Sequence, residues 1–252
     1  ENLVHLGLNV AVVEAAAQVM APIDPEMATP VHDRMRAHGI DLRLGSAVAA
    51  IGPHDVTLTT GDILSADLVV AAIGVRPETT LAEQAGLAIG ERGGILVDDE
   101  LRTSDPAVLA VGDAVEKTDA VDGTAALIPL ANTANLQGRR AADVIAGQAA
   151  RNRPVLGTAI VGVLGLQIAS TGWSEKRLRA AGRDVRTIHT HPASHATYYP
   201  GADTIALKLL VDPHTDEILG AQGVGESGVD KRIDVIATAM AGRLTASALA
   251  DL

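Results

Sequence analysis

The chain has 252 residues, a formal net charge of −11 and no cysteine. The negative charge predicts a surface that repels nucleic acid and anionic membranes, and no apolar run reaches the roughly 18 residues of a membrane-spanning helix. The lack of cysteine excludes disulfides, iron–sulfur clusters and thiol catalysis by these residues, and it is consistent with a cytoplasmic protein.

The first 80 residues alternate predicted strands and a helix, which is the pattern of a nucleotide-binding domain. Asp24 followed by Pro25 predicts the start of a helix, because an aspartate caps and a proline fits the first turn, and Gly39 is a natural end. The predicted strands are residues 10–14, 40–44, 48–51, 56–59 and 68–73. The last of these is continuously apolar, as in a strand buried on both faces.

Residues 95–97 and 108–111 are two further predicted strands, and a helix is expected over residues 135–147. The polar segment 151–154 is a plausible linker. After it the pattern is that of an α+β unit, mostly antiparallel, with a hairpin turn at residues 212–216. Its predicted strands are residues 158–163, 168–171, 185–189, 204–211 and 218–225, with a short helix after Ser174 and a final helix over 229–241.

Glu14 ends its strand as the ribose-binding acid of a Rossmann unit does, yet only 13 residues precede it. The glycine loop of such a unit would lie before Glu1, and Leu252 follows no helix stop signal. We therefore expect the chain to be the C-terminal part of a longer protein.

The segment from Thr103 to Ala114 is the most informative about function. It contains an apolar run that ends on Gly112 and Asp113. Glycine lets a ligand approach the backbone, and a carboxylate at a strand end can accept hydrogen bonds from polyol hydroxyls. The simpler interpretation is a strand followed by a Gly-Asp turn.

Four segments together resemble the pyridine nucleotide-disulfide oxidoreductases, in particular the coenzyme A-disulfide reductase and NADH oxidase/peroxidase branch. They are Val10–Glu14, Ala71–Pro77, the Asp113 segment, and Tyr198–Gly201 taken with Asp230–Asp234. The resemblance covers nearly the whole chain. The last pair is the most specific, since the first two segments occur in many flavoproteins.

The resemblance implies an α/β fold with partial Rossmann-like NAD and FAD domains followed by an α+β dimerisation domain. It assigns residues 1–80 to the NAD(P)-binding domain, 81–150 to the FAD-binding domain and 151–252 to a truncated dimerisation domain, through which a homodimer would form. The implied cofactors are FAD and NAD(P)H. Hydride would pass through the flavin to a redox cysteine, absent here, that reduces a small-molecule disulfide, persulfide, peroxide or oxygen.

The resemblance also assigns cofactor-binding residues. Glu14 would accept the adenosine-ribose hydroxyls and favour NADH over NADPH, and Gly74 would leave room for the dinucleotide. Gly112 and Asp113 would hold the ribityl chain of FAD. The segment Leu130, Ala131 and Asn132 would face the flavin pyrimidine, because helix N-termini stabilise anions, although the family usually has Gly-Pro where this chain has Asn132-Thr133. Each of these cofactor-binding assignments also has a simpler structural alternative: a strand-end acid for Glu14, a turn for the Gly74 and Gly112 positions, and a helix cap for the segment 130–132.

The resemblance implies that Tyr198 is the catalytic residue, because in the family the first of two adjacent tyrosines, here Tyr198 and Tyr199, reaches the partner subunit's active site. A phenol suits this role because it can protonate a leaving thiolate. Packing or surface contact is the alternative for a loop tyrosine.

His189, His191 and His195 lack a completing carboxylate or cysteine, so we expect no metal site. Lys231 and Arg232 either meet coenzyme A phosphates or form surface ion pairs.

Two other functions remain open from the sequence. The absence of cysteine and glycine loops fits a non-catalytic dimerisation and nucleotide-binding module. A ferredoxin reductase-like electron carrier would share Glu14 and Asp113, but it leaves the segment Tyr198–Gly201 unexplained.

Overall fold

The computed structural model describes all 252 residues, which form two compact units. One unit consists of residues 1–72 and 160–252, and the other of residues 73–159. None of the helices has both the length and the apolar character needed to cross a bilayer. The predicted division into three domains stays a prediction.

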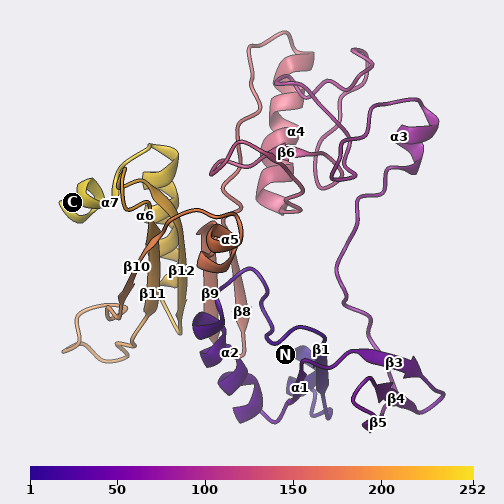
Figure 1. Ribbon diagram of the computed structural model, residues 1–252, viewed down its shortest axis with the longest axis vertical. Coiled ribbons are helices and arrows are strands. Elements are labelled where there is room, and N and C mark those ends of the chain that lie inside the picture. Colours follow the sequence, from indigo (N-terminus) through magenta and orange to yellow (C-terminus); the bar gives the residue numbers. More distant parts are fainter. The chain divides into compact units, whose positions relative to one another are not determined.

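The first part of the larger unit contains helices and two small, separate sheets (Figure 1). Its elements are α1 (Asn2–His5), β1 (Ala11–Glu14), α2 (Pro25–Ala37), β2 (Asp41–Leu44), β3 (Val48–Ile51), β4 (Asp55–Leu58) and β5 (Ile63–Ser65). β1 and β2 pair in parallel, and β3, β4 and β5 form a separate antiparallel sheet. α2 begins at Pro25, with Asp24 at the N-cap position, and Gly39 follows it with φ +79°, as predicted. The Asp24 carboxylate does not cap α2, however, and accepts instead from the N–H groups of Glu175 and Lys176.

The second part of this unit is an antiparallel sheet of five strands in the order β10-β11-β12-β9-β8. Its elements are β8 (Ala159–Val163), β9 (Leu166–Gly172), α5 (Glu175–Ala180), β10 (Arg186–Thr190), β11 (Ala206–Val211), β12 (Ile218–Gly225), α6 (Val229–Ala241) and α7 (Ala246–Ala250). These elements match the predicted ones closely, and β12 and α6 match to the residue.

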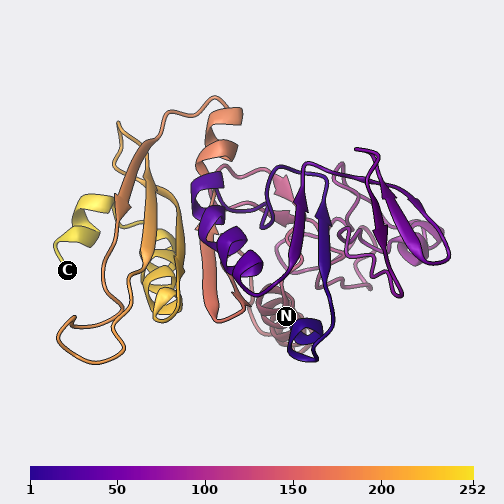
Figure 2. The same ribbon diagram turned by 90° about the horizontal axis from the view of Figure 1, so that it is seen from below.

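Helices cover both faces of this sheet (Figure 2). On one face α2 packs through Met27 and Val31 against residues of β9 and β12. On the other face α6 packs through Ile233 and Ile236. All eight residues of β12 are buried, as expected for a central strand between two layers.

The smaller unit is built around α4 (Ala131–Ile145) and contains little regular strand. Its other elements are α3 (Thr80–Gln84) and the two-residue strands β6 (Lys117–Thr118) and β7 (Ala125–Ala126). The strands predicted at 95–97 and 108–111 do not form. Ile95 makes bridges to Ile89 and Val115, and Leu109 makes one to Arg102, so there is no continuous ladder to support a strand.

The strand predicted at residues 68–73 is also absent. Leu68 is 73% exposed and Ile73 is 97% exposed. A strand buried on both faces needs neighbouring strands and two covering layers, and no segment of this chain supplies them to this run.

Candidate functional site

The turn at Gly112 and Asp113 is held by two buried polar side chains. The Gly112 N–H donates to Oε1 of Gln137 at 2.9 Å, and the Gly112 carbonyl accepts from Nζ of Lys117 at 2.8 Å. Lys117 also donates to the Val115 carbonyl at 3.0 Å. Gln137 is fully buried and Lys117 nearly so. Both backbone groups of Gly112 are therefore fixed, and its φ of +88° is one that glycine adopts without strain.

This turn exposes one carboxylate beside a buried cation. The Asp113 residue is exposed, whereas Lys117 lies in the interior. Burial lowers the pKa of Lys117 below its ordinary value, and the negative charge of Asp113 acts in the opposite direction. The local structure thus presents Asp113 outward on a turn that cannot easily rearrange.

The N-terminus of α4 lies against the same turn. A Cβ placed on Gly112 would sit 3.8 Å from the Cβ of Ala134, in the first turn of α4. Leu130 is the N-cap, in an extended conformation, and no side chain caps the helix. Asn132 instead accepts from the backbone N–H of Thr133 at 2.6 Å. The structure therefore brings the Gly112 turn and the expected segment 130–132 together.

Two features of this site differ from the sequence analysis. α4 begins at Ala131, four residues before the predicted start, so Ala131 and Asn132 are helical. Gln137 and Lys117 were not predicted as site residues. The signal for Gln137 was present, because it is a polar residue on the buried stripe formed by Thr133, Gln137, Ala141 and Val144. Its Nε2 is buried without a hydrogen-bond partner.

Gly74 lies in the smaller unit and is exposed, outside any helix or strand. Its φ is +99°, and nothing lies within 4 Å of a Cβ built there. Backbone conformation, rather than crowding by this chain, therefore requires glycine at this position.

Glu14 ends β1 in the larger unit, opposite Leu44 in the parallel register with β2. Its carboxylate Oε1 accepts the N–H of Ala16 at 2.8 Å, and its carbonyl accepts the N–H of Ser46 at 3.1 Å. The side chain is partly exposed. A carboxylate oriented at the carboxyl end of a parallel strand suits hydroxyl recognition.

Tyr198 lies in the loop between β10 and β11 and is 89% exposed. Tyr199 is 66% exposed, and its ring meets that of His195 edge-to-face with 6.0 Å between the centroids. The two adjacent tyrosines therefore have different surroundings, and only Tyr199 makes a ring contact within the chain.

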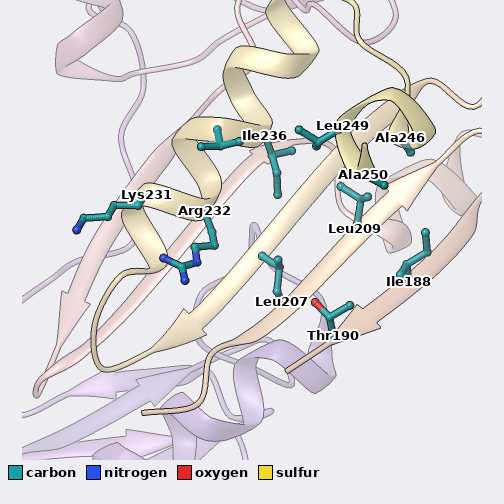
Figure 3. A pocket seen from close by; sticks show the side chains of 11 residues that line it. Ile188, Thr190, Leu207, Leu209, Lys231, Arg232, Ile236, Ala246, Leu249 and Ala250 are labelled. Atoms are coloured by element: carbon teal, nitrogen blue, oxygen red, sulfur yellow. The ribbon is translucent and has the colours of Figure 1, made fainter. Parts of the chain in front are cut away.

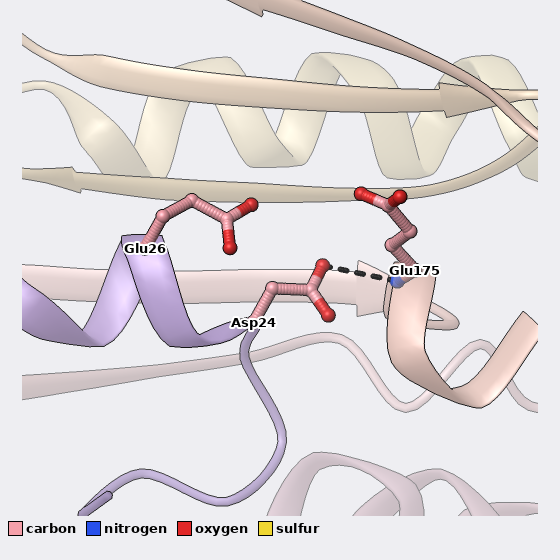
Figure 4. Close-up of side chains that lie close together, drawn as sticks. All are labelled: Asp24, Glu26 and Glu175. Carbon is pink, nitrogen blue, oxygen red and sulfur yellow. Dashed lines mark hydrogen bonds between the residues drawn. The ribbon is translucent and has the colours of Figure 1, made fainter. Parts of the chain in front are cut away.

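The three candidate metal-binding histidines do not share a site. His189 lies 3.9 Å from Glu26, whereas His195 contacts Ser194 and Pro200. The three metal-type ligands that do converge are Asp24, Glu26 and Glu175 (Figure 4). Nζ of the buried Lys208 contacts all three carboxylates, so an ammonium group already supplies the positive charge there.

Lys231 and Arg232 line a pocket of about 510 Å³ in the C-terminal part of the larger unit (Figure 3). The rest of its lining is mainly apolar: Ile188, Thr190, Leu207, Leu209, Val235, Ile236, Ala246, Leu249 and Ala250. Neither cation forms a surface ion pair. Arg232 instead donates from Nη2 to the carbonyls of Ala193 and Ser194, at 3.2 Å each.

Family models match most of the chain. The model for pyridine nucleotide-disulphide oxidoreductases matches residues 1–138, and the model for the dimerisation domain of the same proteins matches residues 158–252.

Individual proteins are similar over the full chain. The coenzyme A disulfide reductase of Staphylococcus haemolyticus is 31% identical, with 100% of this chain and 57% of that protein covered. The crystal structure of reduced Bacillus anthracis CoADR-RHD is 44% identical with a TM-score of 0.98, over 100% of this chain and 46% of that one. The NAD-dependent persulfide reductase from A. fulgidus is 38% identical with a TM-score of 0.95, over 98% and 47%. The chain thus spans about half the length of the proteins it matches.

Proposed function

The chain belongs to the pyridine nucleotide-disulphide oxidoreductase family, and we propose that it is part of an FAD-dependent enzyme that oxidises NAD(P)H. The electrons would reduce a small disulfide, persulfide, peroxide or oxygen through a redox cysteine that this chain does not contain. The names of the relatives, coenzyme A disulfide reductase and persulfide reductase, favour the first two substrate classes.

The observation that carries this proposal is the fixed turn at Gly112. Gln137 and Lys117 bind its N–H and carbonyl, and α4 begins beside it. A turn that only reversed the chain would not need two buried polar side chains to hold one glycine, because each costs free energy to desolvate. The arrangement suits a site in which an exposed carboxylate must be placed accurately.

The chemistry of these groups fits FAD. The Asp113 carboxylate would accept hydrogen bonds from ribityl hydroxyls, and Gly112, which has no side chain, lets a ligand approach the backbone. The Leu130 N–H donates to the Ile128 carbonyl, so the first-turn N–H groups of Ala131 and Asn132 would stabilise negative charge on the flavin pyrimidine beside Leu130. When bound, FAD supplies the capacity to accept a hydride and pass on an electron pair.

Glu14 would hold the ribose of the nicotinamide nucleotide. One of its carboxylate oxygens is fixed by the Ala16 N–H, which orients the group at the end of β1. Its negative charge would repel a 2′-phosphate, so we infer a preference for NADH. Gly74 would leave room for the dinucleotide, since nothing of this chain lies within 4 Å of a Cβ built there.

Tyr198 would act as the catalytic acid when a disulfide is cleaved. The sulfur–sulfur bond breaks as the cysteine thiolate bonds to one sulfur, and the electron pair leaves on the other. The phenol then gives its proton to that departing thiolate and regains one from water. Its 89% exposure leaves it able to reach a surface outside its own loop.

We infer that this surface belongs to a second subunit, since residues 158–252 match the family's dimerisation domain. In the proposed homodimer, residues 1–80 belong to the NAD(P)-binding domain, 81–150 to the FAD-binding domain and 151–252 to the dimerisation domain.

Flavin retention by the Asp113→Asn variant tests the proposal. In the whole protein containing this chain, we expect FAD to bind roughly 10- to 100-fold more weakly, because a hydrogen bond to a charged group contributes about 1.5–3 kcal/mol. The matched control is Asp99→Asn, an exposed aspartate of the same unit. Equal flavin content in both variants after dialysis would contradict the assignment of Asp113.

A further inference from the structure

Arg232 and His195 hold the loop that carries Tyr198, and neither has a role in the function proposed above. The loop spans residues 194–203 and leaves the sheet between β10 and β11. Its base is closed by the Ser194 N–H, which donates to the Asp203 carbonyl at 2.8 Å, and by the Asp203 N–H, which donates to the Ser194 hydroxyl oxygen at 3.2 Å.

Arg232 fixes this base from the first turn of α6. One terminal nitrogen of its guanidinium, Nη2, donates to the consecutive carbonyls of Ala193 and Ser194, at 3.2 Å each. The side chain is part-buried against the loop and has no carboxylate partner among the ion pairs of the structure. A lysine side chain is one bond shorter and ends in a freely rotating ammonium, so it would not hold both carbonyls in the same place. The loop is therefore tied to a helix as well as to the sheet.

His195 connects the base of the loop to its tip. Its Nδ1 lies 3.1 Å from the Ser194 hydroxyl, and its Nε2 lies 3.4 Å from the carbonyl of Pro200. The ring edge also contacts Tyr199, at an interplanar angle of 77°. These contacts give Tyr199, which is 66% exposed, a partner within the loop, whereas Tyr198 is 89% exposed and its ring contacts no other ring of the chain.

We propose that His195 and Arg232 are positioning residues that preorganise the 194–203 loop so that Tyr198, and not Tyr199, is presented to the reacting sulfur. This inference rests on the proposed function, because it takes Tyr198 as the proton donor. It changes the role of Arg232, which acts on backbone carbonyls of this chain rather than on a substrate phosphate.

Transient kinetics of the whole protein test whether His195 positions Tyr198 for proton transfer. We expect His195→Phe to leave flavin reduction by NADH unchanged and to slow reoxidation by the disulfide roughly 10- to 100-fold, since small misplacements of a reacting group cost about that much. The double variant His195→Phe/Tyr198→Phe should be no slower than Tyr198→Phe alone, because both changes remove the same proton transfer. His191→Phe, an exposed histidine before the loop, is the matched control.

Arg232→Lys distinguishes positioning from phosphate binding. Positioning predicts a lower reoxidation rate at saturating substrate with KM unchanged, whereas loss of a phosphate contact would raise KM and be largely rescued by lysine. Reoxidation at the wild-type rate in His195→Phe, with Tyr198→Phe slowed, would overturn this inference and leave the role of Tyr198 intact. A wild-type rate in Tyr198→Phe would refute the role of Tyr198 and this inference with it.

Discussion

Replacing Lys208 by methionine removes an ammonium group that three carboxylates share. Lys208 lies on β11, fully buried, opposite Gln222 of β12. Its Nζ is 2.9 Å from Asp24 and 2.7 Å from Glu175, and it also bonds to Glu26. The cluster joins α2, α5 and the sheet, so its loss should destabilise the larger unit.

The magnitude follows from the burial of each carboxylate. Removing one partner of a buried ion pair costs about 3–5 kcal/mol, because a buried charge is left uncompensated. Asp24 is nearly fully buried, but it keeps hydrogen bonds from Gln222 and from the N–H groups of Glu175 and Lys176. Glu26 is half exposed and can turn to water. We therefore expect the lower end of that range, about 3 kcal/mol.

Trp173 fluorescence during guanidinium unfolding measures this change. It is the only tryptophan, is 5% exposed, and directly precedes the N-cap of α5. The matched control is Lys231→Met, an exposed lysine expected to change stability by less than about 0.5 kcal/mol. An unfolding midpoint for Lys208→Met equal to that of wild type would refute the reasoning.

The pH dependence of this stabilisation has a definite sign. Burial raises the pKa of Asp24, but the hydrogen bonds from Lys176, Lys208, Glu175 and Gln222 outweigh it and hold the pKa below the ordinary 3.8. Burial lowers the pKa of Lys208, but the three carboxylates outweigh it and hold the pKa above 10.5. The stability that Asp24 contributes is thus present above pH 3.8 and is lost as the pH falls through its folded-state pKa. The stability that Lys208 contributes is present below pH 10.5 and is lost as the pH rises through its folded-state pKa. The stability difference between wild type and Lys208→Met should be constant near neutrality and shrink at both extremes.

Three further substitutions have definite expected outcomes. Gly172→Ala should destabilise the protein by about 3 kcal/mol in guanidinium unfolding, because the new Cβ combines positive-φ strain with a clash against the Leu219 carbonyl oxygen. Gly182→Ala also has positive φ but meets open space, so it should cost only about 1–2 kcal/mol, and equal losses for the two variants would refute the clash. Gly112→Ala should cost about 1–2 kcal/mol through its φ of +88° and lower the flavin content of the purified protein, and an unchanged content would contradict the site. Glu14→Ala should shift the ratio of kcat/KM values for NADPH and NADH about tenfold towards NADPH, equivalent to about 1.4 kcal/mol, and an unchanged ratio would exclude a ribose contact.

Elements whose signals are local could be predicted from the sequence. Asp24-Pro25 marks the start of α2, and the apolar periodicity of residues 229–241 gives α6 to the residue. The hairpin turn at 212–216 joins β11 and β12, since the Asp212 N–H bonds to the Glu217 carbonyl there. In each case the residues that determine the element lie within it or beside it.

Features that depend on distant partners were not accessible in this way. The apolar run 68–73 has the composition of a buried strand, but burial depends on neighbouring strands that the run itself cannot specify. Lys208 occupies an ordinary strand position, and its partner Glu26 lies 182 residues away along the chain. For the same reason Lys117 could not be predicted as a site residue, because its role depends on a hydrogen bond to the Gly112 carbonyl and not on a sequence motif.

The most direct test of the account is an absorbance measurement on the whole protein containing this chain, before and after anaerobic addition of NADH. We expect one FAD per subunit, whose visible absorbance bleaches on addition of NADH and recovers when a small disulfide or persulfide is added. A colourless protein that takes up no added FAD, with Gly112 and Asp113 intact, would contradict the assignment of this turn as a flavin site.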